Sequence, residues 1–187
     1  MEAKVAPGLL LSMPHLLDPN FTRAVVLMVE HSEEGSFGLV VNQPSDLAVA
    51  ELLEQLDIDW RGADDAVVWS GGPVTPSTGW VLHEPIAGLV PDEDGSMVDV
   101  APGIVLSTSP EILRDIAAAP PRRVRFLLGY AGWGPGQLAH EMVRGSWLHA
   151  APSPEIIFDT PADEMWERAV RSVGVDPEAL IPGQGVH

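Results

Sequence analysis

Three stretches of the chain carry residue types that could perform chemistry, and the first is Glu30 with His31. A carboxylate beside an imidazole is suited to proton transfer, which is the chemistry of a hydrolase. The alternative is structural: at the ends of strands, these two side chains and Asn42 would satisfy backbone groups of the adjoining turns. The residue types favour the structural interpretation and leave the hydrolase as an alternative.

The second stretch offers a hydroxyl, an imidazole and a carboxylate at Ser12, His15 and Asp18. These are the residue types of a nucleophilic triad, but such triads assemble from segments that are distant in sequence. The chain also has no Gly-x-Ser-x-Gly elbow. Asp18 before Pro19 is better explained as the cap of a helical turn.

The third stretch, which we call the glycine–aromatic segment, runs from residue 129 to residue 141 and combines four glycines with two aromatic residues. Glycine permits positive φ and close backbone approach, so this composition indicates a shaped loop. Loops held by a scaffold often carry binding sites. The candidate binding residues here are Gly132, Trp133, Gln137 and Glu141. Packing is the competing role for Trp133.

This region partly matches two cofactor-binding motifs, and in each case one residue is incompatible with the motif. Residues 134–139 match the Gly-x-Gly-x-x-Ala pattern of dinucleotide-binding folds, but Pro135 has no N–H to offer a pyrophosphate. His140 and Glu141 resemble the start of a zinc-protease helix, but Arg144 stands where the second histidine is required. We therefore expect no cofactor and no metal site.

The chain is strongly acidic, with 27 Asp and Glu against 10 Lys and Arg and a formal net charge of −17. Because nucleic acids and anionic membranes repel a polyanion, direct binding to either is disfavoured. Arg122, Arg123 and Arg125 are a local exception. Three arginines at the start of a strand are typical of an edge or a surface.

The absence of cysteine excludes disulfides and thiolate chemistry. The first residues lack the basic and apolar regions of a signal peptide. No apolar run approaches the roughly 20 residues that a membrane span needs. We therefore expect a cytoplasmic protein.

The elements that must position these residues are short. Apolar runs and alternation predict strands at residues 24–29, 36–41, 66–69, 80–83, 97–100, 104–106, 124–130, 147–150 and 155–158. Capping and stop signals predict helices at residues 46–56 (capped by Ser45), from Ser109 and Pro110 to residue 118, up to residue 144, and at residues 160–174.

Neighbouring strands are often joined by short turns, which favours antiparallel pairing. The sequence therefore predicts an α+β fold. We expect a single compact domain over residues 1–180, with a mainly antiparallel, curved β-sheet flanked by about four helices. Residues 181–187 would form a loose tail.

A series of motifs follows along residues 8–158. They are Ser12-Met13-Pro14, Asp18-Pro19-Asn20-Phe21, Glu30-His31, residues 38–44, Gly71-Gly72-Pro73-Val74, residues 129–133, Gly136-Gln137-Leu138, Glu141 and Trp147. Their order and number resemble the AlgH/YqgE family of bacterial proteins. The resemblance implies a barrel-like antiparallel sheet and a place in the bacterial cytosol, and it supplies no catalytic assignment.

That family carries a label as a transcriptional regulator, through a link to alginate production. This chain is acidic and shows no helix-turn-helix pattern. A regulatory role would therefore act through protein contacts.

Our leading hypothesis is a non-enzymatic protein that binds a protein partner or a small ligand. The expected binding surface comprises Ser12, Asp18, Glu30, His31, Asn42, Gly132, Trp133, Gln137 and Glu141. A single pocket requires Trp133 to lie within about 20 Å of His31 or Asn42. A hydrolase that uses Glu30 and His31, and a regulator that acts through protein contacts, are the alternatives.

Overall fold

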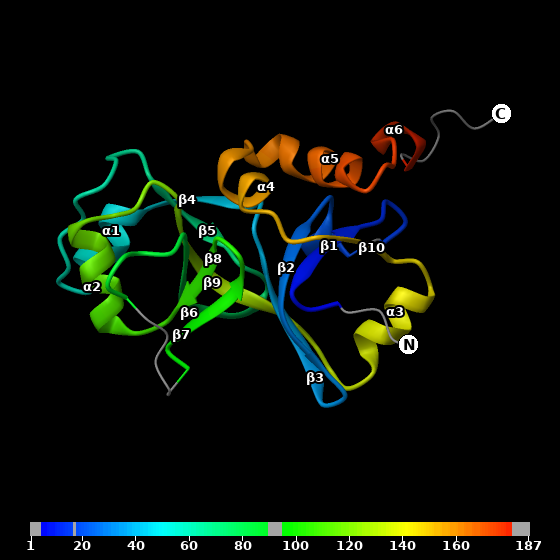
Figure 1. Cartoon of the computed structure of the whole chain (residues 1–187), viewed down its shortest axis with the longest axis horizontal. Helices are drawn as coiled ribbons and strands as arrows, with labels where there is room; N and C mark the ends of the chain where they lie inside the picture. Colours follow the sequence, from blue (N-terminus) through cyan, green and yellow to red (C-terminus); the bar gives the residue numbers. More distant parts are fainter. Residues whose placement is uncertain (1–4, 17, 90–94, 181–187) are drawn as a thin grey trace.

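The apolar run that begins at Val25 forms a strand whose first four residues are fully buried. The computed structural model describes residues 5–16, 18–89 and 95–180, so the expected tail at 181–187 lies outside the described residues (Figure 1). Its strands are β1 (Gly8–Ser12), β2 (Val25–Ser32), β3 (Gly35–Val40), β4 (Pro44–Ala48), β5 (Val67–Ser70), β6 (Val74–His83), β7 (Met97–Ala101), β8 (Ile104–Ser107), β9 (Val124–Trp133) and β10 (Trp147–Ala150).

The helices are short and lie around this sheet. They are the 3-10 turn η1 (Pro19–Phe21) and the α-helices α1 (Val49–Glu54), α2 (Pro110–Ala118), α3 (Gln137–Val143), α4 (Pro154–Asp159), α5 (Ala162–Ser172) and α6 (Pro177–Leu180). Figure 1 shows α1 and α2 at one end, α3 at the other, and α4 and α5 lying across the sheet between them. Within the described residues, no helix is both long and apolar enough to cross a membrane.

The strands pair in the order β10-β1-β2-β3-β9-β6-β8-β7, and every neighbour in that path is antiparallel. Strand β5 lies beside β9 in the one parallel pairing recorded for the described strands, and β4 pairs with β5. The predicted α+β class with a mainly antiparallel, curved sheet in a single compact domain is therefore confirmed.

Strand β9 joins the two halves of the sheet. It pairs with β6 from Val124 to Tyr130 and with β3 from Ala131 to Trp133. At the crossover Gly72 has a φ of 144°, and a Cβ there would lie 2.3 Å from the carbonyl group of Tyr130. Only glycine fits so close an approach in that region of φ.

Helices cover both faces of the central strands. Val25 and Leu27 of β2 share a core cluster with residues of α5, while Val26 and Met28 point to the other face and pack with Leu138 of α3. A third cluster buries Ile112 and Ile116 of α2 against the β6–β9 half of the sheet. Burial on both faces explains why β2 is a continuous apolar run rather than an alternating one.

Three sequence predictions of local structure are wrong. Residues 46–56 begin as strand β4 and are helical only over Val49–Glu54, because Ser45 donates its hydroxyl to the carbonyl of Val68 (2.5 Å) instead of capping a helix. Residues 155–158 belong to helix α4, whose first turn is capped by Ser153. The expected loop at residues 131–133 is a continuation of strand β9.

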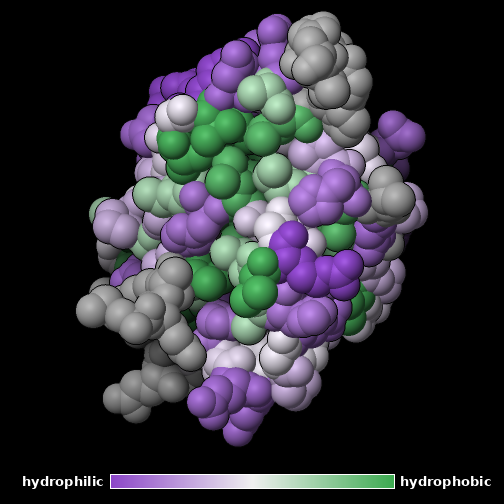
Figure 2. Space-filling view, turned by 90° about the vertical axis from the view of Figure 1, so that its right-hand side faces the viewer, coloured by the Kyte–Doolittle hydropathy of each residue, from purple (hydrophilic) through white to green (hydrophobic). Residues whose placement is uncertain are grey.

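The surface is not uniformly charged despite the high net charge. Figure 2 views the end of the molecule on the right in Figure 1, where hydrophobic side chains reach the surface between hydrophilic areas. Val143, the last residue of α3, is 88% exposed.

Candidate functional site

The ends of three neighbouring strands, β2, β3 and β9, surround an open concavity of about 460 Å³. Figure 1 shows the β2–β3 hairpin projecting from the sheet at this point. We call this feature the hairpin concavity. Its lining residues are Glu30, Ser32, Glu34, Gly35, Ser36, Phe37, Val74, Tyr130, Gly132 and Trp133.

Strand register places the predicted residues in two rows. One row runs from Glu30 through Phe37 to Gly132, and the next runs from His31 through Ser36 to Trp133. Strands lie about 4.8 Å apart, so the backbones of His31 and Trp133 are about 10 Å apart. Because neighbouring residues of a strand face opposite ways, the two rows point to opposite sides of the sheet.

Glu30 and His31 therefore lie in different rows. Both side chains are exposed, but Glu30 lines the hairpin concavity and His31 is not among its lining residues. The ring Nδ1 of His31 lies 2.6 Å from the hydroxyl of Ser36, and the tautomer of the ring decides which of the two atoms donates.

An aromatic cluster forms one wall of the hairpin concavity. Phe37 stacks on Trp80 at a centroid distance of 5.6 Å, and both rings meet Tyr130 edge-on, at 6.1 and 6.2 Å. Three rings in mutual contact hold one another in fixed orientations. The wall is therefore rigid, and the carboxylates lie beside it.

Glu141 holds the neighbouring tryptophans in place. Its Oε1 accepts hydrogen bonds from the indole N–H groups of Trp133 (3.1 Å) and Trp147 (2.9 Å), and its Oε2 accepts one from the amide of Gln137 (3.0 Å). Gln137 in turn accepts one from the backbone N–H of Gly134. Trp133 is only 5% exposed, so these residues fasten α3 to β9 beneath the hairpin concavity.

The remaining predicted residues lie at the far end of β2. Asn42 accepts from the N–H of Val25 and donates to the carbonyl of Arg23, while the buried hydroxyl of Ser12 accepts from the N–H of Ala24. The carbonyl of Asp18 accepts from Phe21 at the start of η1. With a rise of about 3.4 Å per residue, this end of β2 is about 17 Å from Glu30.

Sequence reasoning missed a buried histidine in the other half of the sheet. His83 is 1% exposed, and its Nδ1 lies 2.7 Å from the carbonyl of Glu84, which requires a proton on Nδ1. Nε2 then accepts the hydroxyl proton of Ser107 at 2.8 Å. Burial lowers the pKa of His83. The sequence feature that could have indicated a buried histidine is its place at the end of an apolar strand.

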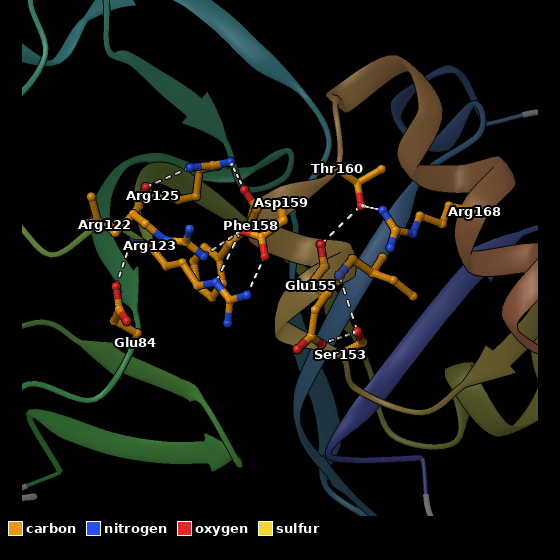
Figure 3. Close-up of polar contacts among 12 residues, drawn as sticks. Glu84, Arg122, Arg123, Arg125, Ser153, Glu155, Phe158, Asp159, Thr160 and Arg168 are labelled. Atoms are coloured by element: carbon orange, nitrogen blue, oxygen red, sulfur yellow. Dashed lines mark hydrogen bonds and ion pairs between the residues drawn. The ribbon is translucent and has the colours of Figure 1, made fainter.

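The three arginines at the start of β9 meet residues of α4 (Figure 3). Arg123 binds both carboxylate oxygens of Asp159, and Arg122 lies 3.8 Å from the same group. The hydrogen bond from Arg123 lowers the pKa of Asp159 and raises that of Arg123. Arg125 bonds only to backbone carbonyls of Val124 and Phe158, and burial lowers its pKa. Arg122 is exposed, as expected of a surface feature, but Arg123 and Arg125 are both half-buried.

Within residues 5–16, 18–89 and 95–180, no three His, Asp or Glu side chains are grouped so that they could hold a metal ion. The hairpin concavity combines carboxylates with aromatic rings, and the arginine end of β9 combines a guanidinium with aromatic rings. That the sequence-predicted residues bind a ligand stays a prediction.

Comparison with known proteins places the chain in a family. A family model described as AlgH-like matches residues 9–178. A UPF0301 protein from Myxococcus xanthus is 42% identical over 184 residues, covering 98% of each chain. A UPF0301 protein from Proteus mirabilis is 38% identical over 183 residues, covering 94% of this chain and 95% of the relative.

Two solved structures have the same fold. The solution structure of the AlgH protein from Pseudomonas aeruginosa covers 100% of this chain and 98% of its own, at 37% identity and a TM-score of 0.76. A crystal structure of a protein from Corynebacterium diphtheriae covers 91% of this chain and 87% of its own, at 23% identity and a TM-score of 0.71, and is similar in fold. The family match, the relatives and the AlgH structure agree with the motif order along the sequence, and the chain belongs to the AlgH-like family.

Proposed function

We propose that this protein is a non-enzymatic binding protein whose hairpin concavity takes a lysine or arginine side chain of a partner protein. One observation carries the proposal: two glutamates, Glu30 and Glu34, line the concavity together with Phe37 and Tyr130, and none of its lining residues is basic. A carboxylate pair attracts a cation, and aromatic faces add a cation–π contribution.

The charge of the whole chain supports the same class of partner. A formal net charge of −17 creates a long-range field that attracts basic surfaces and raises their association rates. The hairpin concavity lies at an exposed hairpin end, where a protein surface can approach it without a conformational change in the sheet. A cytosolic regulator that acts through protein contacts would use the same surface.

The test is binding of a lysine-rich hexapeptide at about 150 mM salt, followed by calorimetry, with its glutamine counterpart as the ligand control. The site variant is Glu30→Gln with Glu34→Gln. The matched control is Glu51→Gln with Glu54→Gln on α1, which removes the same two charges elsewhere.

The site variant should weaken peptide binding about tenfold, and the control variant should change it less than twofold, because two nearby carboxylates each contribute about 0.7 kcal/mol. Equal weakening in both variants would show attraction to net charge alone and would overturn the proposal.

A hydrolase is the second candidate, and the observation that favours it is the short contact between His31 and Ser36. A hydroxyl in contact with an imidazole is the start of a nucleophilic pair. The test is turnover of p-nitrophenyl acetate by the wild type and by Ser36→Ala. Loss of turnover in Ser36→Ala, with an unchanged unfolding curve, would support a hydrolase. Equal rates would exclude this pair.

A further inference from the structure

A second cavity, separate from the hairpin concavity, opens where the first residues of β5 and β9 lie beside each other. Its volume is about 230 Å³. We call it the arginine cavity. It is lined by Val49, Trp60, Asp65, Ala66, Val67, Trp69, Val124, Arg125 and Phe126. Apart from Asp65 and Arg125, these residues are apolar or aromatic.

Arg125 is the unusual member of this lining. Its neighbours Arg122 and Arg123 both pair with Asp159, but no carboxylate of the described residues lies within 4 Å of the Arg125 guanidinium. Its Nε–H is shielded from solvent and has no hydrogen-bond partner among those residues. Asp159 acts on Arg125 through space without pairing directly with it, so the Nε–H keeps no acceptor, and a buried N–H without an acceptor is costly.

The guanidinium is also held in a fixed orientation. Its two terminal nitrogens donate to the carbonyls of Val124 and Phe158, each at 2.9 Å (Figure 3). Its central carbon lies 4.8 Å from the ring centroid of Trp69. A guanidinium has five N–H donors, so three of the five stay unused. A planar fork that is already fixed loses little entropy when it binds an anion.

We propose that the arginine cavity binds a small aromatic monocarboxylate, with the carboxylate on Arg125 and the ring against Trp60, Trp69 and Phe126. The planar fork of arginine matches a carboxylate, and edge-to-face aromatic contact already exists between Trp60 and Phe126 at 5.3 Å. Asp65 is exposed and lines the same cavity, so it repels a doubly charged anion more than a singly charged one.

The experiment titrates the full chain with phenylacetate and follows the indole N–H signals of the tryptophans by NMR. We expect saturable shifts of Trp60 and Trp69, while Trp133, which lies at the far end of β9, stays unmoved. Phenylethanol, which has the same ring without the charge, should bind at least tenfold more weakly. Inorganic phosphate should cause no saturable shift.

Two variants separate binding from folding. Arg125→Lys keeps the charge and loses the fork, and should weaken phenylacetate binding about tenfold. Asp65→Asn, on the exposed rim, should strengthen it about threefold because it removes a repelling charge. Arg122→Gln is the matched control, since it removes a neighbouring cation that does not line the cavity, and it should change affinity less than twofold.

The proposal is overturned if phenylacetate causes no saturable shift of Trp60 and Trp69, or if phenylethanol or phosphate binds as well as phenylacetate. It is also overturned if Asp65→Asn leaves the affinity unchanged and Arg122→Gln lowers it as much as Arg125→Lys does. That last pattern would mean that the three arginines attract anions only through their summed charge.

Discussion

The hairpin concavity and the arginine cavity lie toward opposite ends of β9, and the first is lined by two carboxylates whereas the second is lined by one guanidinium and one carboxylate. Both have aromatic walls, but the carboxylates of the first, at Glu30 and Glu34, are exposed, whereas the Nε–H of Arg125 in the second is shielded from solvent. A solvated charge costs little to keep, and its contribution to binding is correspondingly modest. A shielded N–H without an acceptor is costly, so the retention of Arg125 indicates a site more strongly.

The largest expected effect tests whether the two regions are independent. Trp133→Ala should lower the free energy of unfolding by about 3–5 kcal/mol, because it empties a buried site and leaves Glu141 without one of its indole donors. Urea unfolding measures the change. The variant should lose hexapeptide binding but keep phenylacetate binding under conditions in which it is folded. Loss of both would show that β9 couples the two regions, and a change below 1 kcal/mol would contradict the structural role.

A middle-sized effect concerns His83, which pairs with Val124 at the arginine end of β9. Burial lowers the folded-state pKa of His83, so below its ordinary value of about 6.5 the unfolded chain takes up a proton that the folded chain does not. The free energy of unfolding should therefore fall as the pH drops from about 6.5 toward the folded pKa, by at most about 1.4 kcal/mol per pH unit.

His83→Gln should remove this part of the pH dependence, because an amide can still pair with Ser107 and Glu84 without titrating. Urea unfolding at pH 7.5, 6.5 and 5.5 measures it. His31→Gln is the control, since its ring is exposed at the opposite end of β9. If the free energy of unfolding of His83→Gln still falls between pH 6.5 and pH 5.5 as in the wild type, the pH dependence arises from another titratable group.

The smallest effect concerns the exposed ion pair of Arg123 with Asp159. The hydrogen bond from Arg123 lowers the folded-state pKa of Asp159, so its contribution to stability is present above the ordinary value of about 3.9 and is lost as the pH falls through the folded pKa. Asp159→Asn should flatten the decline of the thermal midpoint in that range, and Asp64→Asn should leave it unchanged. An unchanged decline in Asp159→Asn would mean that the solvated ion pair does not contribute measurably to stability.

The sequence predicts the parts of the fold that depend on neighbouring residues. The β2–β3 hairpin and the Ser109 cap of α2 follow from local patterns, and both are present. The helix expected at 46–56 fails because Ser45 has a better partner 23 residues away, in Val68. Tertiary context overrides local propensity there.

The candidate site is less predictable than the fold. The approach of His31 to Trp133 follows from the strand register between β2, β3 and β9. The two residues are more than 100 positions apart in the sequence, so no local pattern predicts this approach. Arg125 is of the same residue type as Arg122 and Arg123, so sequence reasoning assigns all three arginines the same surface role. What distinguishes Arg125 from the other two is the position of Asp159, which pairs with Arg122 and Arg123. Asp159 ends helix α4, and the sequence predicts a strand for that segment.

The sheet order has a consequence for the chain during its synthesis. Strand β3 pairs with β9, and β1 pairs with β10, so the outer edges of the early β1–β2–β3 unit stay without partners until about 150 residues have left the ribosome. An unpaired strand edge is a template for aggregation. Nascent chains that stall between β8 and β9 should therefore depend on chaperones more than chains stalled after β10 do.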